Sequence, residues 1–242
     1  MSQPRFYDLN VHSRPDGNTE PEQMASIAGR IGYSGIAITN HSSSKDAVVE
    51  VDTPGIEVFR GVELMVSNAS KLHGLVGKYR NKVDVLVVHG GNEDVNRAAV
   101  ENPNVDVLAH PQTSRDGGIN HVLARSASEN NVAIGFNMDT IIKGRGGRRV
   151  QTLSHFRKNL ELVRKYDVPM LLTSNAASRF DMRAPREMIA LAGLFGMRRD
   201  EAIDALSRIP EQIINHNRLS AGPLCEGVDI IKEETLSEGE FL

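Results

Sequence analysis

Seven short apolar runs, separated by stretches with helical periodicity, constrain the fold of this chain more than any other feature. The runs are continuously apolar and do not alternate with polar residues, which is typical of strands buried on both faces of a parallel sheet. Parallel neighbours need a crossover connection, and the intervening helical stretches can supply it. The predicted strands are 6–12, 34–41, 57–64, 83–89, 105–111, 132–137 and 168–174.

The predicted helices lie between these strands, and several more follow the last strand. The first begins at Thr19, where Thr19 and Glu22 resemble a capping box, Pro21 suits the first turn, and Gly32 ends the helix. The second contains two glycines and is a weak helix. The predicted helices are 19–31, 67–79, 93–101, 118–130, 149–166, 185–195, 199–207 and 210–217.

Because the strands all end in polar residues, we expect a TIM-like (β/α) barrel with about seven parallel strands and extra C-terminal helices. A doubly wound open sheet is the alternative. With 242 residues, 40% of them hydrophobic, the chain can bury one large core or form two small domains. We expect a single barrel domain over residues 1–220. Residues 221–242 carry six acids against Lys232, so we expect a disordered acidic tail.

Several protein classes do not fit the sequence. No apolar run approaches the roughly 20 residues of a membrane helix, and the N-terminus lacks the features of a signal peptide. A single cysteine, Cys225, excludes an internal disulfide framework and a cysteine-rich zinc site. Neither a Gly-rich dinucleotide fingerprint nor a Walker loop is present. We therefore expect a soluble, cytoplasmic protein without a membrane partner.

Polar side chains occur where the predicted strands end. In a barrel these positions converge on one mouth, where active sites of this fold usually lie. A ring of His, Asn and Glu is typical of a metal cluster for phosphoester hydrolysis, although each histidine by itself is more often a hydrogen-bonded core or surface residue. The candidate positions are Asn10, His12, Asn40, His41, Glu63, His89, His110 and Asn175.

Positive charge is concentrated between residues 143 and 186, with eleven Lys and Arg against three acids, whereas the whole chain carries a net charge of −3. Such segregation indicates a polyanionic partner. With no Trp, four Tyr and seven Phe, contact with nucleic acid would depend on phosphates and shape, which favours a folded RNA. The candidates are Lys143, Arg145, Arg148 and Arg149 in a loop with three glycines, and Arg179, Arg183 and Arg186 after the seventh strand.

The remaining cations of this stretch lie on the predicted long helix. Arg157, Lys158, Arg164 and Lys165 fit a solvated helix face as well as they fit RNA contact. They are therefore not included among the RNA-binding candidates.

Five of the strand-end segments resemble the metal-binding motifs of the polymerase-and-histidinol-phosphatase superfamily, in the same order along the chain: DLNVH (8–12), ITNH (38–41), GVE (61–63), HP (110–111) and SNA (174–176). In active members of that superfamily, His stands at the place of Asn10, and Asp stands at the places of Asn40 and Asn175. An amide is a weak metal ligand and cannot act as a base, so a two-metal centre would lose binding charge and water activation.

More specifically, the chain resembles the ribonuclease P protein component 3 family over about residues 5–217. The residues that carry this resemblance are YDLN (7–10), IGYS (31–34), AI (37–38), TSNAA (173–177), MRAP (182–185) and LFGM (194–197). The resemblance implies a barrel-shaped, RNA-binding subunit of a ribonucleoprotein endonuclease that removes the 5′ leader from precursor tRNA.

The same resemblance implies that catalysis belongs to the RNA and its metal ions. We then expect no catalytic residue, no bound metal and no tightly held cofactor in the chain, with Mg²⁺ serving the RNA-catalysed reaction. The implied partners are ribonuclease P RNA, ribonuclease P protein component 2, other ribonuclease P proteins, and precursor tRNA as the substrate of the assembly.

Two other functions are compatible with parts of the sequence. A metal-dependent phosphoesterase would use His12, His41, Glu63, His89 and His110 as ligands, and the amides at positions 10, 40 and 175 argue against it. A scaffold protein without RNA contact is the other possibility, and the concentration of positive charge argues against that.

Overall fold

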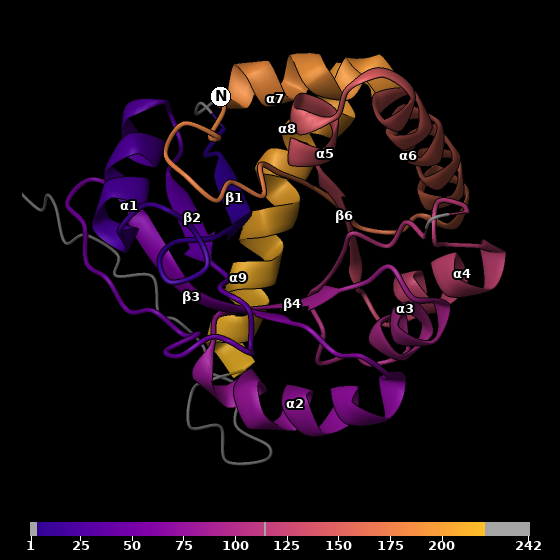
Figure 1. Cartoon of the computed structure of the whole chain (residues 1–242), viewed down its shortest axis with the longest axis horizontal. Coiled ribbons are helices and arrows are strands. Elements are labelled where there is room, and N and C mark those ends of the chain that lie inside the picture. Colours follow the sequence, from indigo (N-terminus) through magenta and orange to yellow (C-terminus); the bar gives the residue numbers. More distant parts are fainter. Residues whose placement is uncertain (1–3, 114, 221–242) are drawn as a thin grey trace, which may run out of the picture.

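The structure is a computed structural model that describes residues 4–113 and 115–220. Seven parallel strands form one sheet in sequential order, which curves into a nearly closed barrel with helices around it (Figure 1). The predicted barrel is confirmed, and the doubly wound alternative, in which the strand order reverses, is wrong. The strands are β1 (Tyr7–Val11), β2 (Gly35–Ile38), β3 (Glu57–Leu64), β4 (Val85–His89), β5 (Val107–Ala109), β6 (Ala133–Asn137) and β7 (Met170–Thr173).

The helices before α9 surround the barrel, and all the helices follow the predicted order with one addition, the short helix α5 directly after β6. The helices are α1 (Pro21–Arg30), α2 (Leu72–Tyr79), α3 (Glu93–Val100), α4 (His121–Glu129), α5 (Asp139–Lys143), α6 (Gly146–Tyr166), α7 (Pro185–Ala192), α8 (Arg199–Leu206) and α9 (Arg208–Ser220), with 3₁₀ turns at η1 (Ala69–Lys71), η2 (Arg80–Lys82) and η3 (Gly193–Phe195).

Local capping explains several helix boundaries. The side chains of Asn92 and Asn120 accept hydrogen bonds from the first backbone amides of α3 and α4, as N-cap residues do. α6 ends at Asp167, which adopts a left-handed conformation with φ of 51°. The capping box predicted at Thr19 is wrong, because the N-cap of α1 is Glu20, and the Thr19 hydroxyl instead accepts a hydrogen bond from the amide of Arg179.

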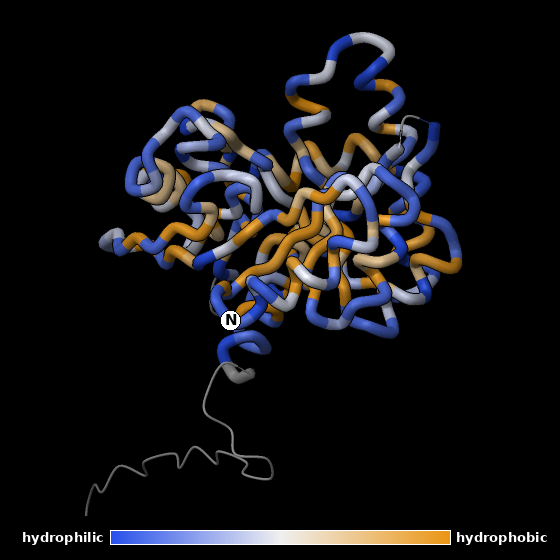
Figure 2. Tube along the Cα trace, turned by 60° about the horizontal axis from the view of Figure 1, so that its bottom comes forward, coloured by the Kyte–Doolittle hydropathy of each residue, from blue (hydrophilic) through white to orange (hydrophobic). Residues whose placement is uncertain are grey.

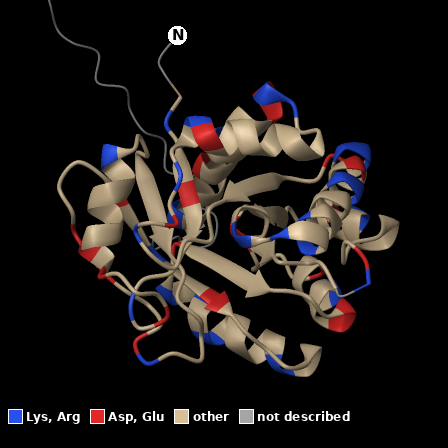
Figure 3. Cartoon of the chain, turned by 45° about the horizontal axis from the view of Figure 1, so that its top comes forward, with Lys and Arg blue, Asp and Glu red and all other residues tan. Residues whose placement is uncertain are grey.

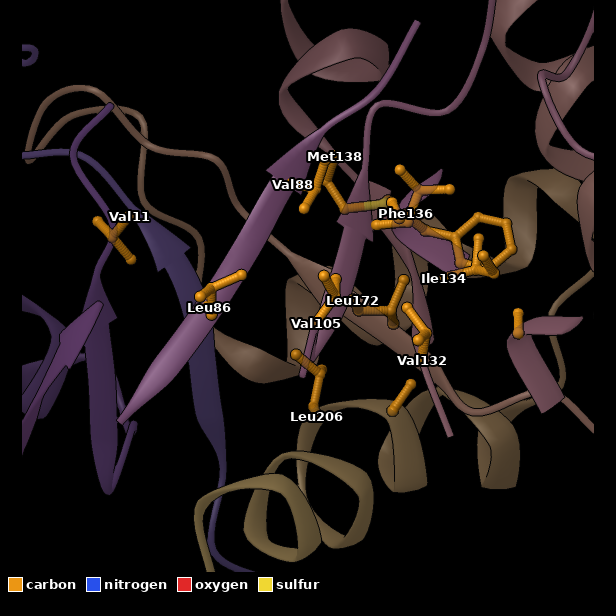
Figure 4. Close-up of a cluster of buried hydrophobic side chains, with 14 of the residues drawn as sticks. Val11, Leu86, Val88, Val105, Val132, Ile134, Phe136, Met138, Leu172 and Leu206 are labelled. Atoms are coloured by element: carbon orange, nitrogen blue, oxygen red, sulfur yellow. The ribbon is translucent and has the colours of Figure 1, made fainter. Parts of the chain in front are cut away.

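Two apolar clusters hold the barrel together. The larger one fills the layer between the outer face of the strands and the helices, and Figure 2 shows the strands as an apolar interior within more polar surroundings. Burial of this layer provides the main driving force for folding. Figure 4 shows part of it, with the labelled side chains Val11, Leu86, Val88, Val105, Val132, Ile134, Phe136, Met138, Leu172 and Leu206.

The smaller cluster lies inside the barrel and is closed by the last helix. Ile213 and Ile214 of α9 are buried among inward-facing residues of the strands, including Leu9, Phe59 and Leu171. Near the end of α9, the amide of Asn217 donates to the carbonyl oxygen of Asp84, which precedes β4, and to Asp106, which precedes β5, both at 2.9 Å. α9 therefore blocks the end of the barrel at which the strands begin, and it crosses the barrel in Figure 1.

The barrel closes between β7 and β1 without a full ladder of strand hydrogen bonds. A single parallel bridge joins Val11 to Ala176, and the amide of His12 donates to the carbonyl oxygen of Ala176 at 2.9 Å. Below it, the buried carboxylate of Asp8 accepts a hydrogen bond from the amide of Ser174 at 3.1 Å. We call this junction the β7–β1 seam.

The predicted acidic tail at 221–242, together with Cys225, lies outside the described residues, so the domain boundary at residue 220 stays a prediction. Among the residues that are described, no helix has both the length and the apolar character required to cross a membrane.

Candidate nucleic-acid interface at the barrel mouth

Four histidines lie in a row across the barrel mouth, the end at which the strands finish. Their ring centroids are 4.8 Å apart for His12 and His41, 6.1 Å for His41 and His89, and 4.8 Å for His89 and His110. A cavity opens beside this row. Its lining consists of His12, Asp16, His41, His89, His110, Asp139, Lys143, Asn175 and Ala177.

Glu63 lies beneath the histidines and is completely buried. Its Oε1 is 2.5 Å from Nδ1 of His89, and its Oε2 is 3.3 Å from Nε2 of His12. Burial alone would raise the pKa of Glu63, but the contacts with the two imidazoles hold that pKa well below its usual range. Burial lowers the pKa of His12, whereas the neighbouring carboxylate of Glu63 raises it. The net effect is a raised pKa of His12. Glu63 is thus an ionised carboxylate compensated by its histidine neighbours.

Two acids at the mouth were missed by the sequence reasoning. Asp16 receives hydrogen bonds from the backbone amide of His41 and from Ser44, and it lies 3.0 Å from Nδ1 of His41. Asp139 begins α5, and burial raises its pKa to about 6, against hydrogen bonding from Asn175 and the charge of Lys143. Asp16 stands in a Pro-Asp-Gly sequence, which is typical of a turn and does not indicate a site residue. Asp139 could have been predicted from its position two residues after β6, because residues that follow the strands lie at the barrel mouth.

The three amide positions do not share one environment. Asn10 and Asn40 are fully buried, and their side chains hold neighbouring segments together. Oδ1 of Asn10 accepts from the Thr39 hydroxyl at 2.6 Å, and Oδ1 of Asn40 accepts from the amide of Ser13 at 2.9 Å. Asn175 does line the mouth, with Oδ1 2.9 Å from Nε2 of His12. Two of the predicted rim positions have therefore become internal supports.

The donor atoms at the mouth form two overlapping groups that could each hold a cation. Within the described residues, the groups His12–Asp16–His41 and His41–Glu63–His89 each have ligand atoms within 4.8 Å of one another. His41 belongs to both groups, so two ions that each used three of these ligands would have to share it.

The two groups of basic candidates lie side by side at the mouth. Lys143, at the end of α5, lines the cavity and forms an ion pair with Asp181, 3.5 Å away in the segment after β7. This contact brings the start of α6 next to the second group, although the whole of α6 and β7 separates them in the sequence. We call the combined set the basic rim, which consists of Lys143, Arg145, Arg148, Arg149, Arg179, Arg183 and Arg186.

The start of α6 differs from the predicted loop. α6 begins at Gly146, three residues before the predicted start at Arg149, so Arg148 also belongs to its first turn and not to the loop. Arg145 donates to the carbonyl oxygen of Ile142 at 2.8 Å, and Arg149 donates to that of Ile141 at 2.9 Å. These bonds tie the last carbonyls of α5 to α6 and fix the two arginines in place.

Farther along α6, cations serve packing between helices. Arg164 makes a two-pronged contact with Glu201 of α8, at 2.8 and 2.7 Å, and Arg157 donates to the carbonyl oxygen of Leu194 at 3.0 Å. Figure 3 shows Lys and Arg on α6 and at its start, and also on other elements, with Asp and Glu among them. The basic stretch thus divides into the basic rim and the later cations of α6, of which Arg157 and Arg164 join the helix to its neighbours.

Comparison with known proteins decides the family. A family model described as RNase P subunit p30 matches residues 5–221. The chain belongs to this family. As a member of the RNase P subunit p30 family, it is a protein subunit of ribonuclease P, a ribonuclease that processes tRNA.

Individual relatives agree with the family match. "Ribonuclease P protein component 3" of Methanococcoides burtonii is 59% identical over 232 residues, which cover 96% of each chain. A chain in a cryo-EM structure of archaeal ribonuclease P with mature tRNA has a TM-score of 0.77 and 27% identity, with coverage of 94% of this chain and 100% of that chain.

A histidinol phosphate phosphatase from Lactococcus lactis, solved with zinc, L-histidinol and phosphate, shares the fold alone. Its TM-score is 0.51 at 12% identity, and the match covers 80% of this chain and 95% of that one. Membership of the RNase P subunit p30 family is thus supported over the phosphoesterase alternative.

Proposed function

We propose that this ribonuclease P subunit holds ribonuclease P RNA on its basic rim and so supports the RNA-catalysed removal of the 5′ leader from precursor tRNA. The observation that carries the proposal is the ion pair between Lys143 and Asp181, which joins two basic segments into one surface. Arginines that are already fixed by hydrogen bonds lose little conformational entropy when they meet phosphates.

The proposed partners are those of a ribonucleoprotein: ribonuclease P RNA, protein component 2, other ribonuclease P proteins, and precursor tRNA as substrate. The support is the similarity to a chain of an archaeal ribonuclease P that was solved with mature tRNA. The proposal includes a cytoplasmic location, where such an assembly would meet its substrate.

The proposal also assigns catalysis to the RNA, with Mg²⁺, and no catalytic residue to this chain. One observation supports a barrel mouth without a tightly held metal or cofactor: the charge of Glu63 is compensated by His12 and His89. The acids and histidines of the mouth would then act as internal supports of the rim.

Salt dependence tests the RNA contact. A triple variant, Arg145→Ala, Arg148→Ala and Arg149→Ala, should lower the magnitude of the slope of log K against log salt by about one for each phosphate contact removed. The measurement is titration of ribonuclease P RNA with the full chain at several salt concentrations.

The matched control removes three exposed cations from η1, α2 and η2, through Lys71→Ala, Lys78→Ala and Lys82→Ala. In Figure 1, α2 lies on the opposite side of the barrel from α7. This control should leave the slope unchanged. Equal slopes for the triple variant and the control would refute the proposed interface.

A further inference from the structure

Phe180 is the most exposed large apolar side chain among the described residues. It is 75% exposed, compared with 67% for Val150 and 50% for Leu194. Four other phenylalanines, Phe59, Phe136, Phe156 and Phe195, are almost fully buried in the core. A single exposed apolar side chain is common on protein surfaces, so the case for a partner depends on what supports and surrounds this ring.

The segment that carries Phe180 is fixed on both sides. On one side, the amide of Arg179 donates to the Thr19 hydroxyl at 3.1 Å, and Ser178 donates to Asp181 at 3.0 Å. On the other side, Met182 is buried and the Tyr33 hydroxyl donates to the carbonyl oxygen of Arg183 at 2.9 Å. Phe180 is therefore presented by a well-supported turn, so little backbone entropy is lost when the ring binds a partner.

One face of the Phe180 ring already has a cation against it. The guanidinium carbon of Arg179 lies 4.8 Å from the ring centroid. Since the ring is still 75% exposed, its opposite face is open to solvent. Arg183 donates to the carbonyl oxygen of Phe180 at 2.9 Å, which brings a second guanidinium to the same turn. A flat apolar face between arginines matches a nucleobase with its phosphates, since bases stack on aromatic rings while arginines neutralise the backbone.

We propose that Phe180 stacks on an unpaired or terminal base of ribonuclease P RNA, while Arg179 and Arg183 contact the adjoining phosphates. This inference rests on the proposed function and extends it, because it adds a base contact to an interface otherwise built from charge. The surrounding arginines favour RNA over an apolar pocket of another protein subunit as the occupant.

Fluorescence gives a direct test, because the chain contains no tryptophan. In Phe180→Trp, the indole is the only tryptophan, and its emission should be quenched when a ribonuclease P RNA transcript is added. The matched control is Leu194→Trp, which places an indole at a half-exposed site beside the middle of α6. The control should show little quenching at the same RNA occupancy.

Affinity measurements separate stacking from charge. Phe180→Ala should weaken RNA binding by roughly tenfold or more, with an unchanged salt slope, and Phe180→Tyr should retain the affinity of the parent. If Phe180→Ala binds RNA as the parent does and Phe180→Trp is not quenched, while the triple arginine variant still flattens the slope, stacking is wrong and the proposed interface stands.

Two other outcomes would also overturn the stacking proposal. A loss of affinity for protein component 2 in Phe180→Ala, with RNA affinity unchanged, would assign the ring to a protein interface. The second outcome compares the triple arginine variant with the parent, each alone and in complex with component 2. If the two bind RNA equally well, the proposed function is wrong together with the stacking.

Discussion

Asp8 is a buried carboxylate at the β7–β1 seam whose hydrogen bonds come from the backbone amides of Ser174 and Asn10. Burial raises its pKa from 3.8 to about 6, because these hydrogen bonds offset only part of the cost of burying the charge. A charged Asp8 therefore joins the two strands and at the same time opposes folding near neutral pH.

The pH dependence of stability follows from this raised pKa. Below pH 3.8 the stabilising contribution of Asp8 is fully present, and it is lost as the pH rises through about 6, because the folded state keeps a proton that the unfolded chain has released. Asp8→Asn removes this titration. The free energy of unfolding of the variant, relative to the parent, should rise by up to ~3 kcal/mol across this window. Urea unfolding at pH 4 to 8 measures the difference, and a difference that is constant with pH would contradict the assignment.

Metal content tests the residues of the mouth. Elemental analysis of the purified chain should find neither zinc nor manganese in stoichiometric amount, because Glu63 is already compensated by two histidines. Glu63→Ala serves as the reference, since it removes the carboxylate shared by those histidines. About one ion per parent chain, lost in Glu63→Ala, would show that the mouth is a metal site.

At the scale of residues, the sequence predicted where the histidines gather but not how each side chain is used. His12, His41, His89 and His110 lie at the mouth because they end parallel strands, and that position follows from apolar runs alone. The inward turn of Asn10 and Asn40 depends on partners such as Thr39 and Ser13, which only the folded chain brings near.

At the scale of elements, α9 covers the end of the barrel at which the strands begin and excludes solvent from it. Ile213 and Ile214 supply the apolar contacts, and Asn217 satisfies polar groups that precede β4 and β5. A helix that follows the barrel in the sequence thus completes the core inside it. The predicted helix 210–217 placed these residues on a helix, but periodicity does not show which surface a helix meets.

Truncation of a side chain in α9 measures this contribution. Ile214→Ala should lower the free energy of unfolding by about 2–4 kcal/mol, because it leaves a cavity among buried strand residues. The control is Asn215→Ala, which changes an exposed residue of the same helix and should cost well under 1 kcal/mol. Urea unfolding of both variants is the measurement, and equal losses would mean that α9 does not seal the barrel.

The elements that sequence reasoning missed have two physical causes. α5 is five residues long, so its pattern is too short to show a helical period. The start of α6 at Gly146 was missed because glycine disfavours a helix, and contacts such as the hydrogen bond from Arg149 to Ile141 support it there. The strands, which are continuous apolar runs, were predicted in the right number and order.

At the scale of the whole molecule, the barrel is complete on every side except one. Successive strands from β1 to β7 pair with parallel ladders, whereas β7 and β1 meet through the Val11–Ala176 bridge and the hydrogen bond to Asp8. The segment that follows β7 reinforces this side from outside. The amide of Asn18 donates to the carbonyl oxygen of Ala177 at 2.7 Å, next to the bond from Arg179 to Thr19.

The sparse pairing between β7 and β1 has a consequence for how this protein keeps its shape. The segment after β7 that closes this junction also carries Phe180 and the last three arginines of the basic rim. Under the proposed function, a change that disrupts the junction would therefore displace part of the RNA-binding surface. Bound RNA would in turn stabilise the closed junction by mass action. The stability of the fold and the affinity for RNA would then be linked.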